Sequence, residues 1–141
     1  SSRLYQSLIK EKQLFSNIEC YHFGSTDAGL MVIEGKLVKG VDMKLADAAI
    51  EEELEKLRTS LIPEKELQKA KNKTEAALAF EDMSVMNRAN SLAFYELLGN
   101  ANLINEELGR YQDITAAEIQ QHTREIFDSS NSNTIYYYSE N

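Results

Sequence analysis

Residues 17–33 read N-I-E-C-Y-H-F-G-S-T-D-A-G-L-M-V-I, and this stretch decides the predicted fold. Its first seven residues alternate, with Ile18 and Cys20 on one face, which is typical of a strand with one solvated side. A turn composition follows, and residues 30–33 then form a short apolar run of strand type. We therefore expect an antiparallel hairpin that turns around Ser25.

Helix-type patterns flank the hairpin on both sides. A short helix is expected before it, because Leu4, Leu8 and Ile9 share one helical face. After it, apolar side chains recur at spacings of three and four, which is typical of helices that lay one stripe on a core. These side chains are Ile50, Leu54, Leu57 and Leu61; Leu67, Ala70, Thr74, Ala77 and Leu78, continued by Val85, Ala89, Leu92 and Ala93; Leu103, Ile104 and Leu108; and Ile119, Thr123 and Ile126. The ones expected to be buried are Ile50, Leu54, Leu57, Leu78 and Leu92.

Several boundaries can be placed in the second half of the chain. Residues 81–84 disturb the long helical stripe and offer two N-cap candidates, so we expect a kink or break there. Thr115 and Glu118 form a capping box that opens a last helix through Phe127. Residues 134–138 are rich in strand formers and are expected to return to the sheet. The sequence thus predicts an α+β fold, an antiparallel sheet with helices packed on one face.

The chain has 141 residues, of which 23 are acidic and 15 basic, giving a formal charge of −8. This length predicts one domain, residues 1–141, that can bury a core without metals or disulfides. The negative charge repels phosphate backbones and anionic lipids, which argues against nucleic acid and membrane partners. No run of about eighteen apolar residues and no charged-then-apolar leader is present, so a soluble segment without a targeting sequence is expected, in a compartment that the sequence does not indicate.

Candidates for a metal or nucleophilic site are few. His122 and Glu125 lie three residues apart on one helix, yet Ile126 follows, so neither the direct nor the inverted zinc motif is completed and a solvated helix face is favoured. Cys20 and His22 lie on the same side of a strand, which hints at a nucleophile and its base. No third orienting group is visible, so a plain core cysteine is the favoured interpretation.

Two further clusters invite a functional interpretation. The acidic residues in 51–55 and 64–66 spread around their helices, which favours a solvated face over an acid–base or calcium site. Residues 136–138 are three tyrosines, and a sheet strand explains them better than a stacking platform. The sequence therefore assigns no catalytic residue, no metal ligand and no cofactor to this segment.

Four separated stretches agree with one protein family. They are Ser2-Arg-Leu-Tyr5, Asp27-Ala-Gly-Leu30, Glu66-Leu-Gln-Lys-Ala-Lys71 and Thr115-Ala-Ala-Glu118. Their order and spacing cover nearly the whole chain, which resembles the second half of a subunit in the pitrilysin and insulysin family of inverted-zinc-motif peptidases, to which mitochondrial processing peptidase belongs. The resemblance implies two related α+β domains in each half-molecule and two halves that close around a peptide chamber. It also implies that the first strands of the domain precede this segment, so that the N-terminal part of the domain is missing here.

The departures from the family pattern are informative. Active members carry His-x-x-Glu-His, which is absent here, so zinc is expected only in the first domain of the parent chain. A family pattern Arg-x-x-x-Gly/Gln-Leu-x-Tyr supplies an Arg and a Tyr that bind substrate backbone and help polarise the scissile carbonyl. Laid onto this sequence, it runs from Ile9 through Gln13 to Ser16, so both functional side chains are missing.

The resemblance implies a non-catalytic C-terminal domain of a zinc metalloendopeptidase, which forms part of the chamber wall and the subunit interface in proteolysis. Its expected partners are the preceding zinc-binding domain, a sister peptidase-like subunit and the peptide substrate. The alternative is a non-enzymatic structural or assembly subunit on the same fold. An unpaired sheet edge would favour a homodimer of the fragment.

Overall fold

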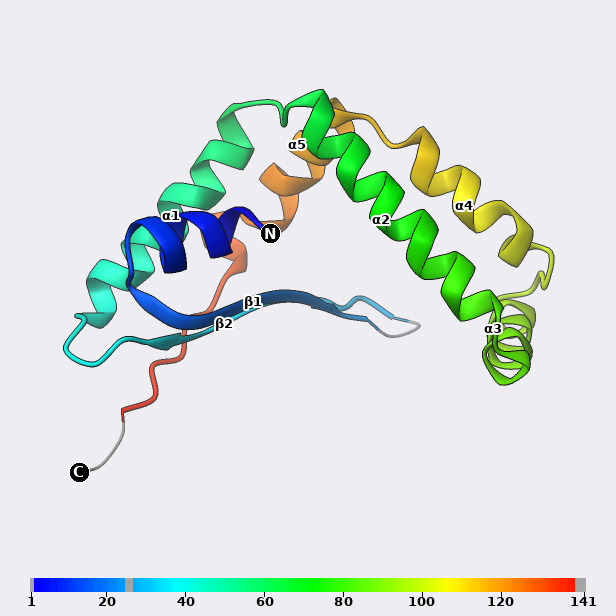
Figure 1. Ribbon diagram of the computed structural model, residues 1–141, viewed down its shortest axis with the longest axis horizontal. Coiled ribbons are helices and arrows are strands. Elements are labelled where there is room, and N and C mark those ends of the chain that lie inside the picture. Colours follow the sequence, from blue (N-terminus) through cyan, green and yellow to red (C-terminus); the bar gives the residue numbers. More distant parts are fainter. Residues whose placement is uncertain (1, 25–26, 139–141) are drawn as a thin grey trace. The chain divides into compact units, whose positions relative to one another are not determined.

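The computed structural model describes residues 2–24 and 27–138 (Figure 1). Its elements are η1 (Tyr5–Glu11), β1 (Phe15–Phe23), β2 (Leu30–Leu37), α1 (Met43–Thr59), α2 (Glu64–Asp82), α3 (Val85–Leu97), α4 (Leu103–Asp113), α5 (Ala116–Ile126) and η2 (Ser129–Asn131). This order confirms the α+β class. The chain divides into two compact units, which we describe separately: unit 1 is Ser1–Ser60 with Gln121–Asn141, and unit 2 is Leu61–Gln120. None of the helices in the described ranges combines the length and apolar character that crossing a membrane needs.

The sheet of unit 1 is the expected antiparallel hairpin of β1 and β2. Phe23 pairs with Leu30, which confirms the hairpin, while Ser25 and Thr26 lie outside the described residues. The register shifts at Ser16, because the residues on either side of it pair with two consecutive residues of β2. Such a bulge bends the strand locally.

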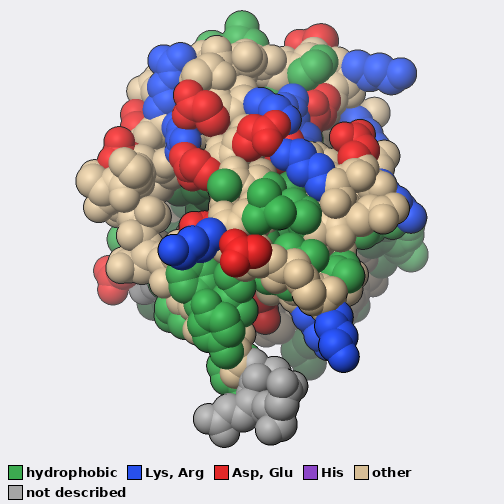
Figure 2. Space-filling view, turned by 90° about the vertical axis from the view of Figure 1, so that its left-hand side faces the viewer, with side chains coloured by type: hydrophobic (Ala, Val, Ile, Leu, Met, Phe, Trp, Pro, Cys, Tyr) green, Lys and Arg blue, Asp and Glu red, His purple; other side chains and the backbone are tan. Residues whose placement is uncertain are grey.

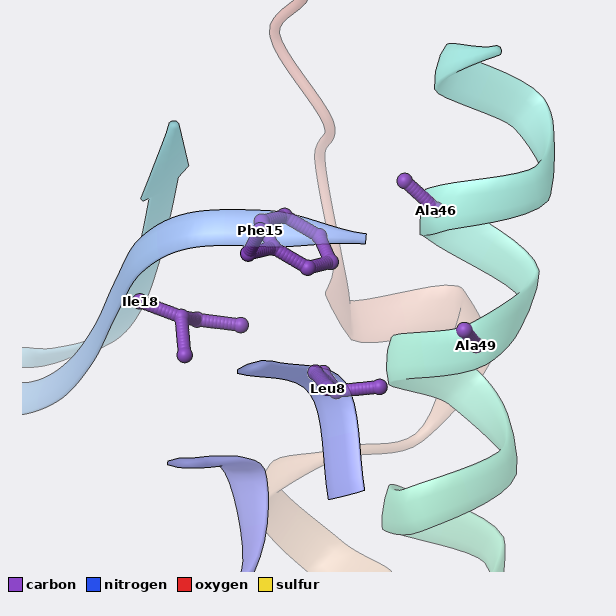
Figure 3. Close-up of a cluster of buried hydrophobic side chains, with 5 residues drawn as sticks. All are labelled: Leu8, Phe15, Ile18, Ala46 and Ala49. Atoms are coloured by element: carbon purple, nitrogen blue, oxygen red, sulfur yellow. The ribbon is translucent and has the colours of Figure 1, made fainter. Parts of the chain in front are cut away.

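Five buried side chains form the core of unit 1 (Figure 3): Leu8, Phe15, Ile18, Ala46 and Ala49. They come from η1, β1 and α1, and Figure 1 shows η1 and α1 on the same side of the hairpin. This arrangement confirms that helices pack on one face of the sheet. The Phe15 ring lies over Gly35, where an added Cβ would be 2.6 Å from its Cε1 atom. Glycine is therefore required at this close approach.

The predicted burial of the α1 stripe is wrong. Ile50, Leu54 and Leu57 are only half-buried, and Leu61 lies beyond the helix and is 58% exposed. The innermost residues of α1 are Ala46, Ala49 and Glu53. The small alanine side chains let η1 pack closely on α1, so the larger aliphatic residues of α1 lie at the margin of the contact instead of at its centre.

Unit 2 consists of α2, α3, α4 and the start of α5. The break expected within residues 81–84 is confirmed, because Ser84 caps α3 by accepting a hydrogen bond from the Asn87 amide at 3.3 Å. The capping box of α5 is also confirmed: the Thr115 amide donates to Glu118 Oε2 at 2.8 Å, and the Glu118 amide donates to Thr115 Oγ1 at 3.2 Å.

Burial in unit 2 differs from the prediction. All of its residues are described, and only Leu67 is buried. Leu78 is half-buried and Leu92 is 44% exposed, so the burial predicted for both is wrong. The least exposed side chains of α3 are the polar Ser91 and Tyr95. The polar side of α3 therefore faces its neighbours, which leaves much of its apolar surface outside.

The predictions for the last two elements are partly wrong. In α5, Thr123 is buried as expected, whereas Ile126 is 43% exposed. Residues 134–138 form no strand, and Ile135 is 93% exposed. Tyr136 instead donates its hydroxyl hydrogen bond to Asp47 of α1 at 2.9 Å. Strand-forming residues adopt a strand only when a neighbouring strand supplies the ladder, and neither β1 nor β2 pairs with this segment.

Candidate functional site

The two positions that the family pattern marks as functional have structural contacts here. Ile9 lies in η1 and packs, partly buried, against the core of unit 1. Ser16 is the bulge residue of β1, and its hydroxyl donates to the Lys36 carbonyl at 3.0 Å. Gln13 lies between them at a φ of +53°, in the left-handed region that glycine adopts without strain. An aliphatic side chain and a hydroxyl bound to backbone cannot supply the charged and phenolic donors that the pattern provides.

The helical pair on α5 is a surface contact. His122 Nδ1 lies 3.1 Å from Glu125 Oε2, and both side chains are more than half exposed, at 65% and 56%. The pKa of Glu125 is lowered by two hydrogen bonds, of which the one from Gln121 has the larger effect and the one from His122 the smaller. Across the described ranges, no three His, Cys, Asp or Glu side chains gather as a metal ion would need. The residues that the structure describes therefore do not fit a zinc ion.

The cysteine of β1 is not a core residue, so the favoured interpretation of Cys20 is wrong. It pairs in register with Ile33 but is exposed, because the core cluster extends along β1 only as far as Ile18. Partial burial nevertheless raises the pKa of its thiol, which disfavours the reactive thiolate. The His22 ring lies against Gly24, where an added Cβ would be 2.6 Å from its Cε1 atom. No hydrogen bond joins the thiol to the imidazole, so these two residues do not form a nucleophile and base.

A buried carboxylate of α1 is the most constrained polar group of unit 1. Glu53 is 5% exposed, and its Oε1 atom accepts hydrogen bonds from Ser7 Oγ at 2.7 Å and Lys56 Nζ at 2.6 Å. Burial raises its pKa, but the contacts with Lys56 and Ser7 outweigh that effect and leave the pKa lowered. The prediction of a solvated face is therefore wrong for Glu53. The signal was present in the sequence, since Glu53 shares a helical face with Ala46 and Ala49.

The other carboxylates of the acidic cluster are exposed but paired. Glu52 binds Lys12 at 2.5 Å and Lys56 at 3.0 Å, and these cations, Lys12 first, lower its pKa to about 2. Glu51 and Glu55 both pair with Arg58. Figure 2 shows acidic and basic side chains interleaved over much of the face that it presents. Because every carboxylate of this cluster has a cation or a donor beside it, the cluster neutralises charge and carries no acid–base pair.

Arg58 also ties the end of α1 to the segment that follows α5. Its Nη1 atom donates to the Phe127 carbonyl at 2.6 Å, and Arg124 Nε donates to the Arg58 carbonyl at 2.8 Å. In the second acidic cluster, which comprises residues 64–66, Glu64 is exposed and Glu66 is half-buried. The polar contacts named above therefore hold elements of unit 1 together, and none of these named contacts presents a group poised for catalysis.

The comparison with protein families agrees with this picture. A family model described as the peptidase M16 inactive domain matches residues 1–74. This match confirms the resemblance drawn from the sequence. None of the curated proteins compared with the chain matches it.

Three solved structures share the fold. A protease from Helicobacter pylori has a TM-score of 0.84 at 20% identity, over 93% of this chain and 32% of that one. The inactive peptidase domain of a "putative zinc protease" from Bordetella parapertussis has a TM-score of 0.81 at 24% identity, over 93% and 70% of the two chains. A "putative zinc protease" from Bordetella pertussis Tohama I has a TM-score of 0.79 at 24% identity, over 93% of this chain and 72% of that one. This chain thus spans about a third of the Helicobacter protein. Because the family model covers 74 of the 141 residues, more than half, the chain belongs to the family of peptidase M16 inactive domains.

Proposed function

We propose that this chain is the non-catalytic domain of a zinc metalloendopeptidase, in which it forms part of the wall of a peptide chamber and part of a subunit interface. Its residues 1–141 would act as one C-terminal domain. The partners are a preceding zinc-binding domain, which holds the metal, and a sister peptidase-like subunit, with a peptide as the substrate. The family match over residues 1–74 supports this proposal.

The observation that carries the proposal is the chemistry of two positions. Polarising a scissile carbonyl requires a donor aimed at the oxygen that becomes negative in the transition state. Ile9 has no donor and packs into the core, and Ser16 directs its hydroxyl to a backbone carbonyl. These two positions therefore cannot take part in the reaction, which supports a non-catalytic role such as part of a chamber wall.

Two measurements on the 141-residue chain test the proposal. Elemental analysis should find no stoichiometric zinc, and incubation with peptides should give no cleavage products. In the parent protein, deletion of this domain should abolish cleavage while the zinc content of the remaining part stays unchanged. Stoichiometric zinc in the isolated chain that is lost on His122→Ala would contradict the proposal, as would full activity of the deleted parent.

A structural or assembly subunit on the same fold is the second candidate, because the same two replacements fit a subunit that has no activity at all. The preceding coding sequence separates the two candidates. An intact His-x-x-Glu-His there supports the peptidase, and a degenerate motif supports the structural subunit.

A further inference from the structure

The outward face of α2 has an unusual order of side chains. Lys65, Lys69 and Lys73 follow one another at four-residue intervals and are all exposed. Side chains four residues apart on a helix lie on one face. The same face continues with Ala76, Phe80 and Met83 at the end of the helix, and all three are exposed. The three lysines thus lead into an apolar end.

The opposite face of α2 is the one that packs within unit 2. Leu67 is buried, and Leu78 is half-buried. Lys71 is also half-buried, and its Nζ atom donates to the Gln112 carbonyl at 2.6 Å. Gln112 in turn donates to Glu75 at 3.2 Å. Packing therefore fixes the rotation of α2 and holds the lysine face outward.

The three outward lysines are uncompensated. In the part of the chain that the structure describes, none of them forms an ion pair, whereas Lys12, Lys56 and Arg58 of unit 1 are all paired with glutamates. Like charges four residues apart destabilise a helix slightly. A free basic stripe in a chain of net charge −8 is therefore available to an external anion.

The apolar end of this face is a cluster of exposed side chains and not a single exposed residue. Phe80 is 74% exposed and Met83 is 79% exposed, and they are followed at the start of α3 by Val85 at 83% and Met86 at 69%. Together these four side chains expose an area on the order of a few hundred Å², a size at which apolar patches mark interaction sites.

We propose that the outward face of α2, which we call the lysine–apolar face (Lys65, Lys69, Lys73, Ala76, Phe80 and Met83), docks an acidic polypeptide segment that ends in apolar side chains. The positive charge of the three lysines is complementary to such a segment, and the apolar side chains that follow them match its apolar end. Carboxylates spaced along such a segment would pair with the lysines, and its apolar end would cover Phe80 and Met83. The inference goes beyond the proposed function, because this surface requires neither zinc nor cleavage.

Nucleic acid and anionic lipid fit this face less well. Both are dense polyanions, and a chain of net charge −8 repels them as a whole. Exposed Phe80 and Met83 have no role along a phosphate backbone. A helix that lies on a membrane carries its lysines on one face and its apolar side chains on another. Here both kinds of side chain follow one another along the same face.

The test measures binding of a synthetic acidic peptide to the 141-residue chain by fluorescence anisotropy. The probe is a fluorescein-labelled helix of about 20 residues with three glutamates at four-residue intervals, followed by Leu and Phe on the same face. The proposal expects saturable binding that weakens as salt rises, since exposed charges are screened. It expects much weaker binding of the same peptide with its glutamates changed to Gln.

Matched variants locate the site. Changing Lys65, Lys69 and Lys73 together to Glu should weaken binding about tenfold or more, because each exposed pair contributes a few-fold and reversal adds repulsion. The control changes three exposed lysines of unit 1 to Glu, with the same change in net charge. These control residues are Lys36, Lys39 and Lys44.

The apolar part is tested separately. The double variant Phe80→Ser and Met83→Ser should weaken binding several-fold, and Phe23→Ser with Leu30→Ser at the hairpin should not. The proposal is overturned if the peptide does not bind, or if the two lysine triples weaken binding equally. It is also overturned if phosphatidylserine vesicles or duplex DNA bind through the lysine–apolar face in place of the peptide. None of these results depends on peptidase activity, so they are distinct from a failure of the proposed function.

Discussion

Replacing the buried glutamate of α1 tests how unit 1 is held together. Glu53→Ala removes the acceptor of two hydrogen bonds, from Ser7 at 2.7 Å and from Lys56 at 2.6 Å. A hydrogen bond to a charged group contributes about 1.5–3 kcal/mol, and a buried polar group left without a partner costs about 1–3 kcal/mol. Ser7 is 9% exposed and would lose its partner, whereas Lys56 keeps Glu52 and water. We therefore expect Glu53→Ala to lower the free energy of unfolding by about 2–4 kcal/mol.

The control for this change is Glu55→Ala, two residues along the same helix. Glu55 is exposed and pairs with Arg58, which keeps its other contacts. Exposed ion pairs contribute about 0–1 kcal/mol, so this variant should be close to the original chain. Urea unfolding followed by circular dichroism measures both values. If Glu53→Ala falls within about 0.5 kcal/mol of Glu55→Ala, the contact with Ser7 does not hold η1 on α1 and the reasoning fails.

Three other predictions concern Gly35 of the hairpin, Gln13 before β1 and the response to acid. Gly35→Ala should destabilise unit 1 by about 1–3 kcal/mol, because its new methyl group would meet the buried Phe15 ring at 2.6 Å, and an unchanged midpoint of thermal unfolding would contradict this. Gln13→Gly should stabilise the chain by up to about 1 kcal/mol, since φ is +53° there, and Gln13→Ala should give no such gain in the same measurement. The pKa of Glu52 is lowered from 4.5 to about 2 and that of Glu53 is also lowered, so the folded state binds fewer protons than the unfolded state as the pH falls below about 5. The stability that these carboxylates supply is therefore present above their unfolded pKa and is lost as the pH falls towards 2, and chemical unfolding at a series of pH values should show the decline.

Local sequence signals predicted the elements of this fold well. The hairpin, the break before Ser84 and the capping box at Thr115 are all set by residues within a few positions of one another, and the structure confirms each of them. The prediction of a terminal strand over residues 134–138 was wrong, because strand propensity only makes a segment compatible with a sheet. It does not supply the neighbouring strand. One of the tyrosines of this segment, Tyr136, instead donates a hydrogen bond to Asp47 of α1.

Burial was harder to predict, because it depends on the surface that each helix meets. The periodicity of α1 marked Ile50 and Leu54 as central, but the closest approach is made by Ala46 and Ala49. The polar contacts show the same dependence. Glu53 is buried on the helical face of Ala46 and Ala49, but its partner Ser7 lies 46 residues away in the chain, and no local pattern indicates that pairing. The positions of the candidate site, by contrast, came from the family resemblance.

The two units distribute stability and surface differently. Unit 1 contains the buried aliphatic and aromatic cluster, and Lys12, Lys56 and Arg58 pair with the glutamates of its acidic helix. Unit 2 buries one side chain, Leu67, while eleven of its large apolar side chains are exposed. A unit of about 60 residues is marginally stable even when its core is well packed, so apolar surface of this extent weakens unit 2 in isolation. Such an arrangement is favourable when part of that surface is covered by a partner, and the same unit carries the unpaired lysines that would select an acidic one. A contact on the proposed lysine–apolar face would cover two of these side chains, Phe80 and Met83, and would at the same time pair the three unpaired lysines.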